Sequence, residues 1–322
     1  MRAALIRAHG GPEAIEVAEL PDPEPGPGQL LVDVAAAGVN FVDVYHRTGA
    51  YPGQLPLQLG TEAAGTVAAV GAGVSGVAAG DRVAWAMRPG AYATRAVVDA
   101  DVAVPVPDGV SDEVAAAVLL QGMTAHYLTA STYPVQAGDT VLVHAAAGGT
   151  GALIVQLAVQ RGATVLATTS TAEKAALARE SGAAEVIRYD QADVAAEVAR
   201  ITGGTGVAAV YDGVGASTFD ASLASLRPRG YLVLFGASSG PVPPVDPRRL
   251  QAGGSLFLTR PTLAHYMADR AELLERSGAV FAAVAAGRLA VRIGGRYPLD
   301  QVGRAHTDLE SRRTTGKLLI IP

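Results

Sequence analysis

A glycine-rich stretch near the middle of the chain has the residue types and spacing of a phosphate-binding turn. Residues 141–151 read VLVHAAAGGTG, an apolar run that ends in Gly148, Gly149, Thr150 and Gly151. Against the pattern GxGxxG, the small residues fall at Ala146, Gly148 and Gly151, so alanine replaces the first glycine. Glycine at 148 lets the backbone approach a diphosphate, and the amides that open the next helix meet its charge. The stretch predicts a dinucleotide site; an ordinary strand-to-helix turn is the alternative.

The residues after the next expected strand indicate which dinucleotide binds. An NAD site usually has an acidic residue about 20 positions after the glycines, to hold the ribose. This chain has Thr-Thr-Ser at 168–170, and Ser170 with Glu173 predicts a capping box that places Lys174 in the first helical turn. Hydroxyl groups and a nearby lysine, with no acidic residue beside them, can bind the 2′-phosphate of NADPH. This pattern therefore favours NADPH over NADH. The alternative is that Ser170 only caps the helix and Lys174 is a solvated surface residue.

A second group of polar side chains lies in the segment GVNFVDVYHRTGAYP at 38–52. A helix that begins at Asn40 places Asn40, Asp43 and Arg47 on one face, because they are three and four residues apart. Tyr45 and Tyr51 would offer phenol groups near a nicotinamide ring. The alternative is that Asn40 is only an N-cap and Asp43–Arg47 only a surface pair.

Composition excludes several other chemistries. With no cysteine, the chain has no thiol nucleophile, disulfide or Cys-ligated zinc. Its six histidines are scattered, so no metal site is expected. His144 lies within an expected apolar strand, which favours a satisfied core residue or a residue at the edge of the ligand site over a catalytic base. The net charge of −5 argues against a nucleic-acid partner. No apolar stretch reads as a signal peptide or a membrane span, which predicts a cytoplasmic protein without a membrane partner.

The first 110 residues predict a β-rich module, because short β-branched runs are separated by turn signals. The expected strands are Leu30–Val34, Gly65–Val70, Arg82–Ala86, Arg95–Val98 and Val102–Val106. A helix is then expected from Ser111 through Leu120.

From about Gly122, strands and helices alternate, which predicts a doubly wound α/β domain with a parallel sheet. After a helix at Met123–Leu128, six strands are expected at Thr140–Ala145, Thr164–Thr168, Glu185–Arg188, Gly206–Tyr211, Tyr231–Phe235 and Ser255–Leu258. The helices between them are Ala152–Gln160, Thr171–Glu180, Val194–Ile201 and Thr218–Leu226.

The tail after Arg260 is too small to form a core by itself. It predicts a helix with Leu273, Leu274, Val280, Phe281 and Val284 on its apolar positions, a turn at Gly287, and strands at Val291–Ile293 and Lys317–Ile321. We expect this tail to return to the N-terminal β module. The predicted domains are therefore residues 1–121 together with 262–322, and residues 122–261.

Taken together, these motifs resemble the zinc-free quinone oxidoreductases, the zeta-crystallin-like branch of the medium-chain dehydrogenase/reductase superfamily. The matching segments run nearly from end to end and include Gly38–Tyr45, Gly60–Gly65, Gly80–Val83, Leu120–Ala125, His144–Gly151, Tyr211–Gly215, Thr259–Pro261, Leu309–Arg312 and Thr315–Lys317. The resemblance implies a discontinuous GroES-like catalytic domain around a Rossmann domain, with NADPH in the cleft between them.

The resemblance also implies roles for individual residues. Asn40, Tyr45, Tyr51 and Thr124 would contact the nicotinamide side, and Gly148, Gly149, Thr150 and Gly151 would hold the pyrophosphate. Ser170, Lys174 and Tyr189 would surround the 2′-phosphate, while Phe235, Ser238, Arg260 and Arg312 would complete the cofactor site. Relatives are commonly dimers that pair through the sixth Rossmann strand, here 255–258, so a homodimer is expected.

Three functions fit these features. The first is NADPH-dependent reduction of quinones without zinc, with Tyr45, Asn40 and Tyr51 as catalytic residues. The second is reduction of an activated double bond, as in an enone or alkenal, with Tyr45 as the proton donor. The third, from another class, is an NADPH-binding protein without catalysis.

Overall fold

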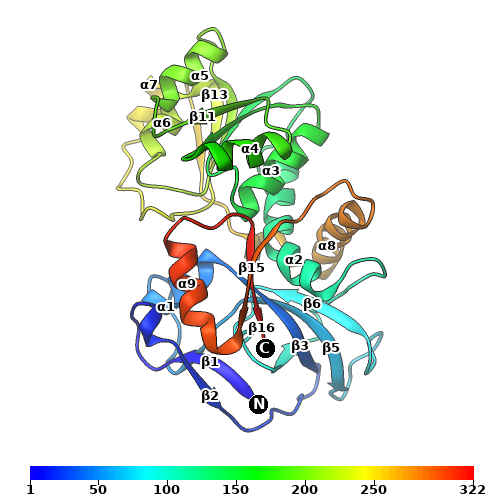
Figure 1. The fold of residues 1–322 in the computed structure, drawn as a ribbon. Coiled ribbons are helices and arrows are strands. Elements are labelled where there is room, and N and C mark those ends of the chain that lie inside the picture. The colour runs from blue at the N-terminus through cyan, green and yellow to red at the C-terminus, as the bar shows by residue number, and fades with distance from the viewer. The chain divides into compact units, whose positions relative to one another are not determined.

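The computed structural model describes all residues from Met1 to Pro322, and the chain divides into two compact units (Figure 1). The first unit joins residues 1–123 to residues 267–322, and the second comprises residues 124–266. The expected domain boundaries lie nearby, at 121/122 and 261/262. None of the helices combines the length and the apolar character that crossing a membrane requires.

One mixed sheet dominates the first unit. Its strands run in the order β15-β16-β3-β5-β6-β8, and β7 also pairs with β3. They are β3 (Gln29–Val39), β5 (Glu62–Val70), β6 (Arg82–Ala86), β7 (Arg95–Asp99), β8 (Val104–Pro105), β15 (Ile293–Pro298) and β16 (Lys317–Ile321). The C-terminal strand β16 lies beside β3 (Figure 1) and runs antiparallel to it, with Leu319 opposite Gly38 in the register. This pairing confirms that the tail returns to the N-terminal β module.

A smaller sheet and an apolar core complete the strands of this unit. The sheet has the order β2-β1-β4, and its strands are β1 (Arg2–Ile6), β2 (Glu16–Glu19) and β4 (Leu57–Gln58). The core gathers fully buried side chains from both chain ends, among them Leu30, Trp85 and Ile320. None of the three short strands was predicted.

Four longer helices begin in the first unit: α1 (Phe41–Thr48), α2 (Asp112–Tyr127), α8 (Arg270–Ala285) and α9 (Val302–Glu310). A short helical turn at Pro12–Ala14 joins β1 to β2, and another at Leu299–Gln301 joins β15 to α9. Helix α2 is continuous, so the expectation of two helices separated near Gly122 is wrong. A Cβ at Gly122 would press on the Val280 side chain of α8, so this glycine allows two helices to pack closely and does not end one.

The second unit is a six-stranded parallel sheet in the order β11-β10-β9-β12-β13-β14, which confirms the doubly wound Rossmann fold. Its strands are β9 (Thr140–Val143), β10 (Thr164–Thr169), β11 (Glu185–Arg188), β12 (Val207–Asp212), β13 (Leu226–Leu234) and β14 (Phe257–Thr259). Its helices are α3 (Gly149–Gln160), α4 (Ala172–Glu180), α5 (Val194–Ile201), α6 (Phe219–Ala224) and α7 (Arg248–Ala252), with single turns at Leu128–Thr132 and Leu263–Tyr266. Leu142, Leu166, Val210 and Leu232 form the centre of its core.

Local chemistry explains where two expected strands differ. The strand expected at Val102–Val106 shrinks to two residues in β8, because Pro105 and Pro107 have no N–H to donate to a ladder. The strand expected at Ser255–Leu258 begins later, at Phe257. Gly254 and Ser255 have φ of 106° and 58°, so the chain is still turning there.

Three further details also differ from the expectations. The helix expected at Thr218–Leu226 ends at Ala224, because Leu226 is buried in the core and already begins β13 opposite Val207. In the tail, the expected strand at Val291–Ile293 instead runs from Ile293 to Pro298. Leu274, expected on the apolar face of α8, is 40% exposed beside Pro105 and Pro107.

Candidate functional site

The glycine turn of the second unit opens α3 as the sequence predicts. Gly148 is the N-cap of α3, with extended φ and ψ of −77° and 166°, and its N–H donates to the Ala145 carbonyl at 2.9 Å. A Cβ on Gly151 would overlap that same carbonyl oxygen, so only glycine lets the turn fold against the helix. No side chain caps α3, and its first backbone N–H groups are the donors that a diphosphate requires.

Four further candidate residues follow the carboxyl ends of four parallel strands. Ser170 follows β10, Tyr189 follows β11, Phe235 follows β13 and Arg260 follows β14. The Tyr189 N–H donates to the Thr169 carbonyl at 3.2 Å, which joins two of these strand ends. Because parallel strands end at the same edge of a sheet, the fold brings these residues to the edge that carries the glycine turn.

The end of β10 carries hydroxyl groups and no carboxylate. Thr171, not Ser170, is the N-cap of α4, because its Oγ1 accepts the N–H of Lys174 at 3.2 Å; the capping box predicted at Ser170 is therefore wrong. Ser170 is left in the loop before the helix, where it is half-buried. Partial burial lowers the pKa of the Lys174 ammonium group, and Tyr189 is 51% exposed.

A buried carboxylate that the sequence analysis did not assign organises the loop after β12. Asp212 is fully buried, and its Oδ1 accepts the backbone N–H groups of Val214 and Gly215 at 2.8 and 3.0 Å. Thr218 and Ser222 donate their hydroxyls to the same carboxylate. An acidic residue at the end of an apolar strand, followed by glycine, was the available signal for this role.

His144 is a satisfied core residue, which is one of the two roles that the sequence left open for it. Its ring nitrogens lie 2.9 Å from Thr168 Oγ1 and 3.0 Å from Ser222 Oγ, and the residue is 2% exposed. Burial lowers the pKa of His144, which favours the neutral ring. The histidine therefore links the end of β10 to the Asp212 loop.

The other expected cofactor residues have different surroundings. The Phe235 N–H donates to the Asp212 carbonyl at 2.8 Å, and its ring packs against Gly213. The Ser238 N–H donates to the Gly213 carbonyl at 3.3 Å, and Arg260 Nη1 donates to the Leu234 carbonyl at 3.1 Å. Thr124 is a buried residue of α2, distant in sequence from this loop. In the first unit, Arg312 follows α9 with a left-handed φ of 58°.

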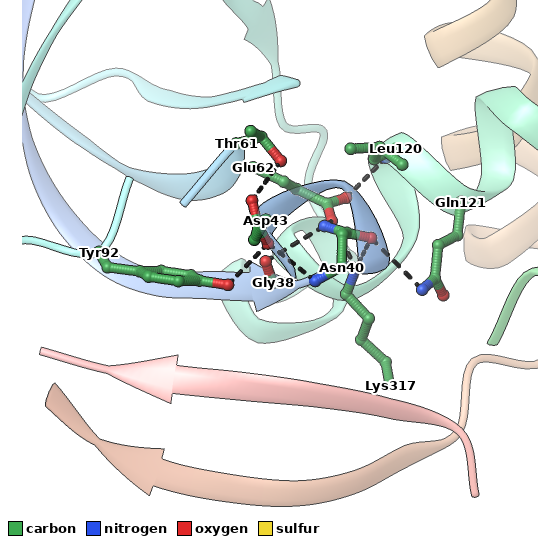
Figure 2. Close-up of polar contacts among 9 residues, drawn as sticks. All are labelled: Gly38, Asn40, Asp43, Thr61, Glu62, Tyr92, Leu120, Gln121 and Lys317. Atoms are coloured by element: carbon green, nitrogen blue, oxygen red, sulfur yellow. Dashed lines mark hydrogen bonds and ion pairs between the residues drawn. The ribbon is translucent and has the colours of Figure 1, made fainter. Parts of the chain in front are cut away.

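The first unit holds a buried polar group, which we call the Asn40 cluster. Its members, shown in Figure 2, are Asn40, Asp43, Thr61, Glu62, Tyr92 and Lys317. Asn40 and Asp43 come from the start of α1, Thr61 and Glu62 from the start of β5, and Lys317 from the first position of β16. The cluster therefore draws on both ends of the chain.

The Asn40 side chain is engaged by protein atoms at both ends of its amide. Its Nδ2 donates to Glu62 Oε2 at 2.9 Å and to the Gly38 carbonyl at 3.2 Å. Its Oδ1 accepts from Lys317 Nζ at 2.7 Å and from Gln121 Nε2 at 3.4 Å (Figure 2). Because these hydrogen bonds hold the Asn40 side chain at both ends, and Asn40 is the N-cap of α1, they fix the start of this helix.

Asp43 is fully buried and accepts three hydrogen bonds. These come from the Asn40 N–H at 2.9 Å, the Tyr92 hydroxyl at 2.7 Å and the Thr61 hydroxyl at 2.8 Å. Burial raises the pKa of Asp43 to about 6, although its hydrogen bonds act in the opposite direction. Burial and the neighbouring carboxylate also raise the pKa of Tyr92 well above 10.0, so Tyr92 stays neutral.

Arg47 does not form the surface pair with Asp43 that was one interpretation of the spacing. It is 1% exposed, and its Nη1 contacts Glu310 Oε1 at 2.7 Å. Its Nε donates to the Gly10 carbonyl at 3.1 Å. Arg47 therefore ties α1 to α9, while Asp43 turns to the Asn40 cluster.

Helix α1 also carries the candidate tyrosine. The rings of Tyr45 and Tyr51 have centroids 5.1 Å apart, and the Tyr51 N–H donates to the Tyr45 carbonyl at 3.0 Å. Tyr51 is 39% exposed. The structure thus brings Tyr45 and Tyr51 together, with Asn40 at the start of the same helix.

Comparison with known proteins covers nearly the whole chain. Residues 26–108 match the alcohol dehydrogenase GroES-like domain, and residues 149–274 match the zinc-binding dehydrogenase family. The chain is 44% identical to a quinone oxidoreductase of Pseudomonas aeruginosa over 98% of both chains. It is 42% identical to a 2-haloacrylate reductase of a Burkholderia species over 99% of this chain and 98% of the other.

Two solved structures that contain NADPH are also similar. A mycobacterial protein in complex with NADPH is 51% identical, with a TM-score of 0.97 and full coverage of both chains. The Escherichia coli quinone oxidoreductase in complex with NADPH is 42% identical, with a TM-score of 0.98 and full coverage of both chains.

The second matched family is described as zinc-binding, but this chain lacks the side chains that a zinc site requires. The chain has no cysteine, and no group of three or more His, Asp or Glu side chains could hold a metal ion. Within the Asn40 cluster, the Lys317 ammonium already neutralises Glu62. By its fold, its two family domains and its identity over almost its full length to quinone oxidoreductases, this chain belongs to the quinone oxidoreductases of the medium-chain dehydrogenase/reductase superfamily.

Proposed function

We propose that this protein reduces quinones with NADPH by hydride transfer, without a metal ion. The observation that carries the proposal is the full-length match to quinone oxidoreductases, one of which was solved with NADPH. NADPH supplies the hydride when it is bound. The protein supplies the binding groups, the orientation of the acceptor and the exclusion of water.

The second unit provides the groups for the phosphates. The amides at Gly148–Gly151 face the pyrophosphate, and Ser170, Lys174 and Tyr189 surround the 2′-phosphate. Supporting this assignment, no carboxylate lies at the end of β10, and the partly buried Lys174 lies in the first turn of α4, which begins next to that strand end. The remaining contacts to the cofactor come from Thr124, Phe235, Ser238, Arg260 and Arg312.

Tyr45 is the residue of the first unit that we assign to the reaction, with Tyr51 beside it. The Tyr45 hydroxyl orients the acceptor or the nicotinamide. Asn40 acts through α1, because protein atoms already engage its amide at both ends. Asn40 is therefore a positioning residue in this proposal.

The 2-haloacrylate reductase among the relatives favours reduction of an activated double bond as a second candidate function. In that reaction hydride adds to one carbon and a proton adds to the carbon beside the carboxylate or carbonyl, with Tyr45 as the proton donor. We retain an NADPH-binding protein without catalysis as the third candidate.

We also propose a homodimer that pairs through β14. This strand lies at the edge of the parallel sheet, and Phe257 on it is 48% exposed. The cytoplasmic location stays a prediction.

Steady-state oxidation of NADPH and NADH tests the function and the cofactor assignment together. With 1,4-benzoquinone as acceptor we expect turnover with NADPH at much lower concentration than with NADH. Lys174→Ala removes a charge-assisted contact worth about 1.5–3 kcal/mol, so KM for NADPH rises roughly 10- to 100-fold while KM for NADH stays the same.

Arg179→Ala is the matched control, because it removes an exposed cation from the last turn of the same helix. It should leave both KM values unchanged. Turnover of 2-chloroacrylate or an enone without turnover of any quinone would replace the first function with the second. Equal KM values for NADPH and NADH in the parent protein would contradict the 2′-phosphate site.

A further inference from the structure

Lysine is rare in this chain, and one of its two lysines is buried. The chain has 25 lysines and arginines together, of which only Lys174 and Lys317 are lysine. Lys174 lies at the proposed phosphate site, whereas Lys317 opens β16 and is 1% exposed. A buried ammonium group has lost its hydration, so its partners must compensate it.

Two partners of Lys317 belong to the Asn40 cluster. Lys317 Nζ lies 2.6 Å from Glu62 Oε2 and 2.7 Å from Asn40 Oδ1 (Figure 2). Glu62 has no exposed surface, and its other oxygen accepts the Leu120 N–H of α2 at 2.6 Å. The ion pair is therefore enclosed on both sides.

The ion pair determines which way the Asn40 amide faces. An ammonium group can only donate hydrogen bonds, and a carboxylate can only accept them. Asn40 lies between the two, so its oxygen must face Lys317 and its NH2 must face Glu62. The reversed amide would place NH2 against an ammonium and oxygen against a carboxylate, and both contacts would be repulsive.

The space around the ion pair admits a lysine and little else. A Cβ on Gly38 would overlap Glu62 Oε2, the Lys317 side chain and the Ala116 carbonyl, so the backbone of β3 already lies against the pair. The planar guanidinium of arginine is wider than a compact ammonium group. A compact ammonium group therefore suits this space better than the guanidinium group that serves at most other basic positions of the chain.

We propose that Lys317 is a positioning residue for the reductase. It fixes the Asn40 amide, and Asn40 in turn fixes the N-terminus of α1, the helix that carries Tyr45. The Asn40 N–H to Asp43 bond at 2.9 Å belongs to the same helix start. This inference rests on the proposed function, because Tyr45 is the group whose placement matters.

Lys317→Met tests the proposal, because it keeps the length of the side chain and removes the ammonium. Alone, it leaves Glu62 buried without a counter-charge and is expected to lower the melting temperature sharply. The double variant Glu62→Gln, Lys317→Met restores charge balance, so we expect a melting temperature close to that of the parent. We expect its kcat with 1,4-benzoquinone to stay at least tenfold below that of the parent, with KM for NADPH unchanged.

Tyr45→Phe provides the second measurement. If Lys317 acts through Tyr45, adding the double variant to Tyr45→Phe lowers kcat by no more than about twofold further. Arg296→Gln is the matched control, because it removes an exposed cation from the neighbouring strand β15, where Arg296 contacts Glu113. We expect parental kcat in the control.

Two results would overturn the proposal. One is parental kcat in the double variant, which would make the ion pair a structural element only. The other is a triple variant whose fold-decrease in kcat equals the product of the decreases caused by the double variant and by Tyr45→Phe, since the two changes would then act independently. If the parent itself reduces no acceptor, the proposed function fails instead, and nuclear magnetic resonance then tests the positioning role of Lys317. We expect the double variant to shift the signals of the Asn40 side-chain amide and the Tyr45 ring. Unchanged signals would overturn the positioning role.

Discussion

At the scale of single residues, the first unit pairs most of its buried charged side chains with a partner of opposite charge. Glu62 pairs with Lys317, and Arg47 pairs with the partly exposed Glu310. Asp43 has no basic partner within hydrogen-bond distance and relies on three neutral donors, which is why burial dominates its pKa. The carboxylate of Asp43 is thus the least compensated charge of the Asn40 cluster.

The raised pKa of Asp43 predicts a loss of stability as pH rises. Between pH 3.8 and about 6 the folded protein keeps a proton on Asp43 that the unfolded chain has released. The stabilisation is fully present below pH 3.8, is lost as pH rises through about 6, and amounts to about 3 kcal/mol. Asp43→Asn removes this titration and can keep the contacts, since its oxygen accepts from Tyr92 and Asn40 and its NH2 donates to Thr61.

Urea unfolding of the parent and of Asp43→Asn at pH 4 and pH 7 measures the effect. We expect the parent to lose roughly 2 kcal/mol relative to the variant between these two pH values, because a part of the stabilisation is already lost at pH 4. Other titrating groups are common to both proteins and cancel in the difference. Free energies of unfolding that change in parallel with pH would show that Asp43 does not titrate in this range.

At the scale of elements, glycine decides how closely α3 can approach the end of β9. The turn at Ala145 has a left-handed φ of 50°, and its carbonyl points to the place where a side chain at 151 would begin. The first amides of α3 remain available because Gly148 has no side chain to cap them. One turn thereby provides both close packing and a site for an anion.

Gly151→Ala is expected to destabilise the second unit by roughly 1–3 kcal/mol and to weaken NADPH binding. Alanine favours a helix by up to about 1 kcal/mol over glycine, but the overlap with the Ala145 backbone outweighs this gain. Gly278→Ala in α8 is the control, because a Cβ there meets no atom within 4 Å. It should raise stability by up to about 1 kcal/mol. Thermal unfolding with and without NADPH measures both, and equal melting temperatures for the two variants would contradict the packing argument.

At the scale of the whole molecule, one unit closes by joining both chain ends and the other leaves an open sheet edge. β16 inserts between β15 and β3, so the mixed sheet includes residues nearly 300 positions apart. In the second unit, β14 ends the parallel sheet, and the Phe257 ring stacks on Tyr231 with centroids 4.4 Å apart. An exposed edge strand with an aromatic residue favours pairing with a second copy.

Phe257→Asp is therefore expected to convert the proposed dimer into a monomer. A charge on each copy at the pairing strand opposes association, because like charges would face each other across the contact. Sedimentation velocity measures the mass of both proteins. Leu274→Asp is the control, since Leu274 is similarly exposed at 40% but lies on α8. Dissociation by Leu274→Asp and not by Phe257→Asp would move the interface to the first unit.

The sequence by itself determined the elements whose signals are local. Strand–helix alternation predicted the parallel sheet, and four strands or helices have the expected bounds: Arg82–Ala86, Glu185–Arg188, Val194–Ile201 and Lys317–Ile321. The glycine turn and the absence of an acidic residue after β10 could also be predicted, because each depends on residues within about 25 positions of one another.

Only the tertiary structure decided what the buried polar residues do. Glu62 and Lys317 are 255 positions apart, and no spacing rule connects them; they meet because β16 returns to β3. The sequence likewise predicted a break between two helices near Gly122, and only the structure shows that Val280 packs against this glycine within one continuous helix. Periodicity reports which face of an element is buried, whereas the partner of a buried charge depends on which distant strands the fold makes neighbours.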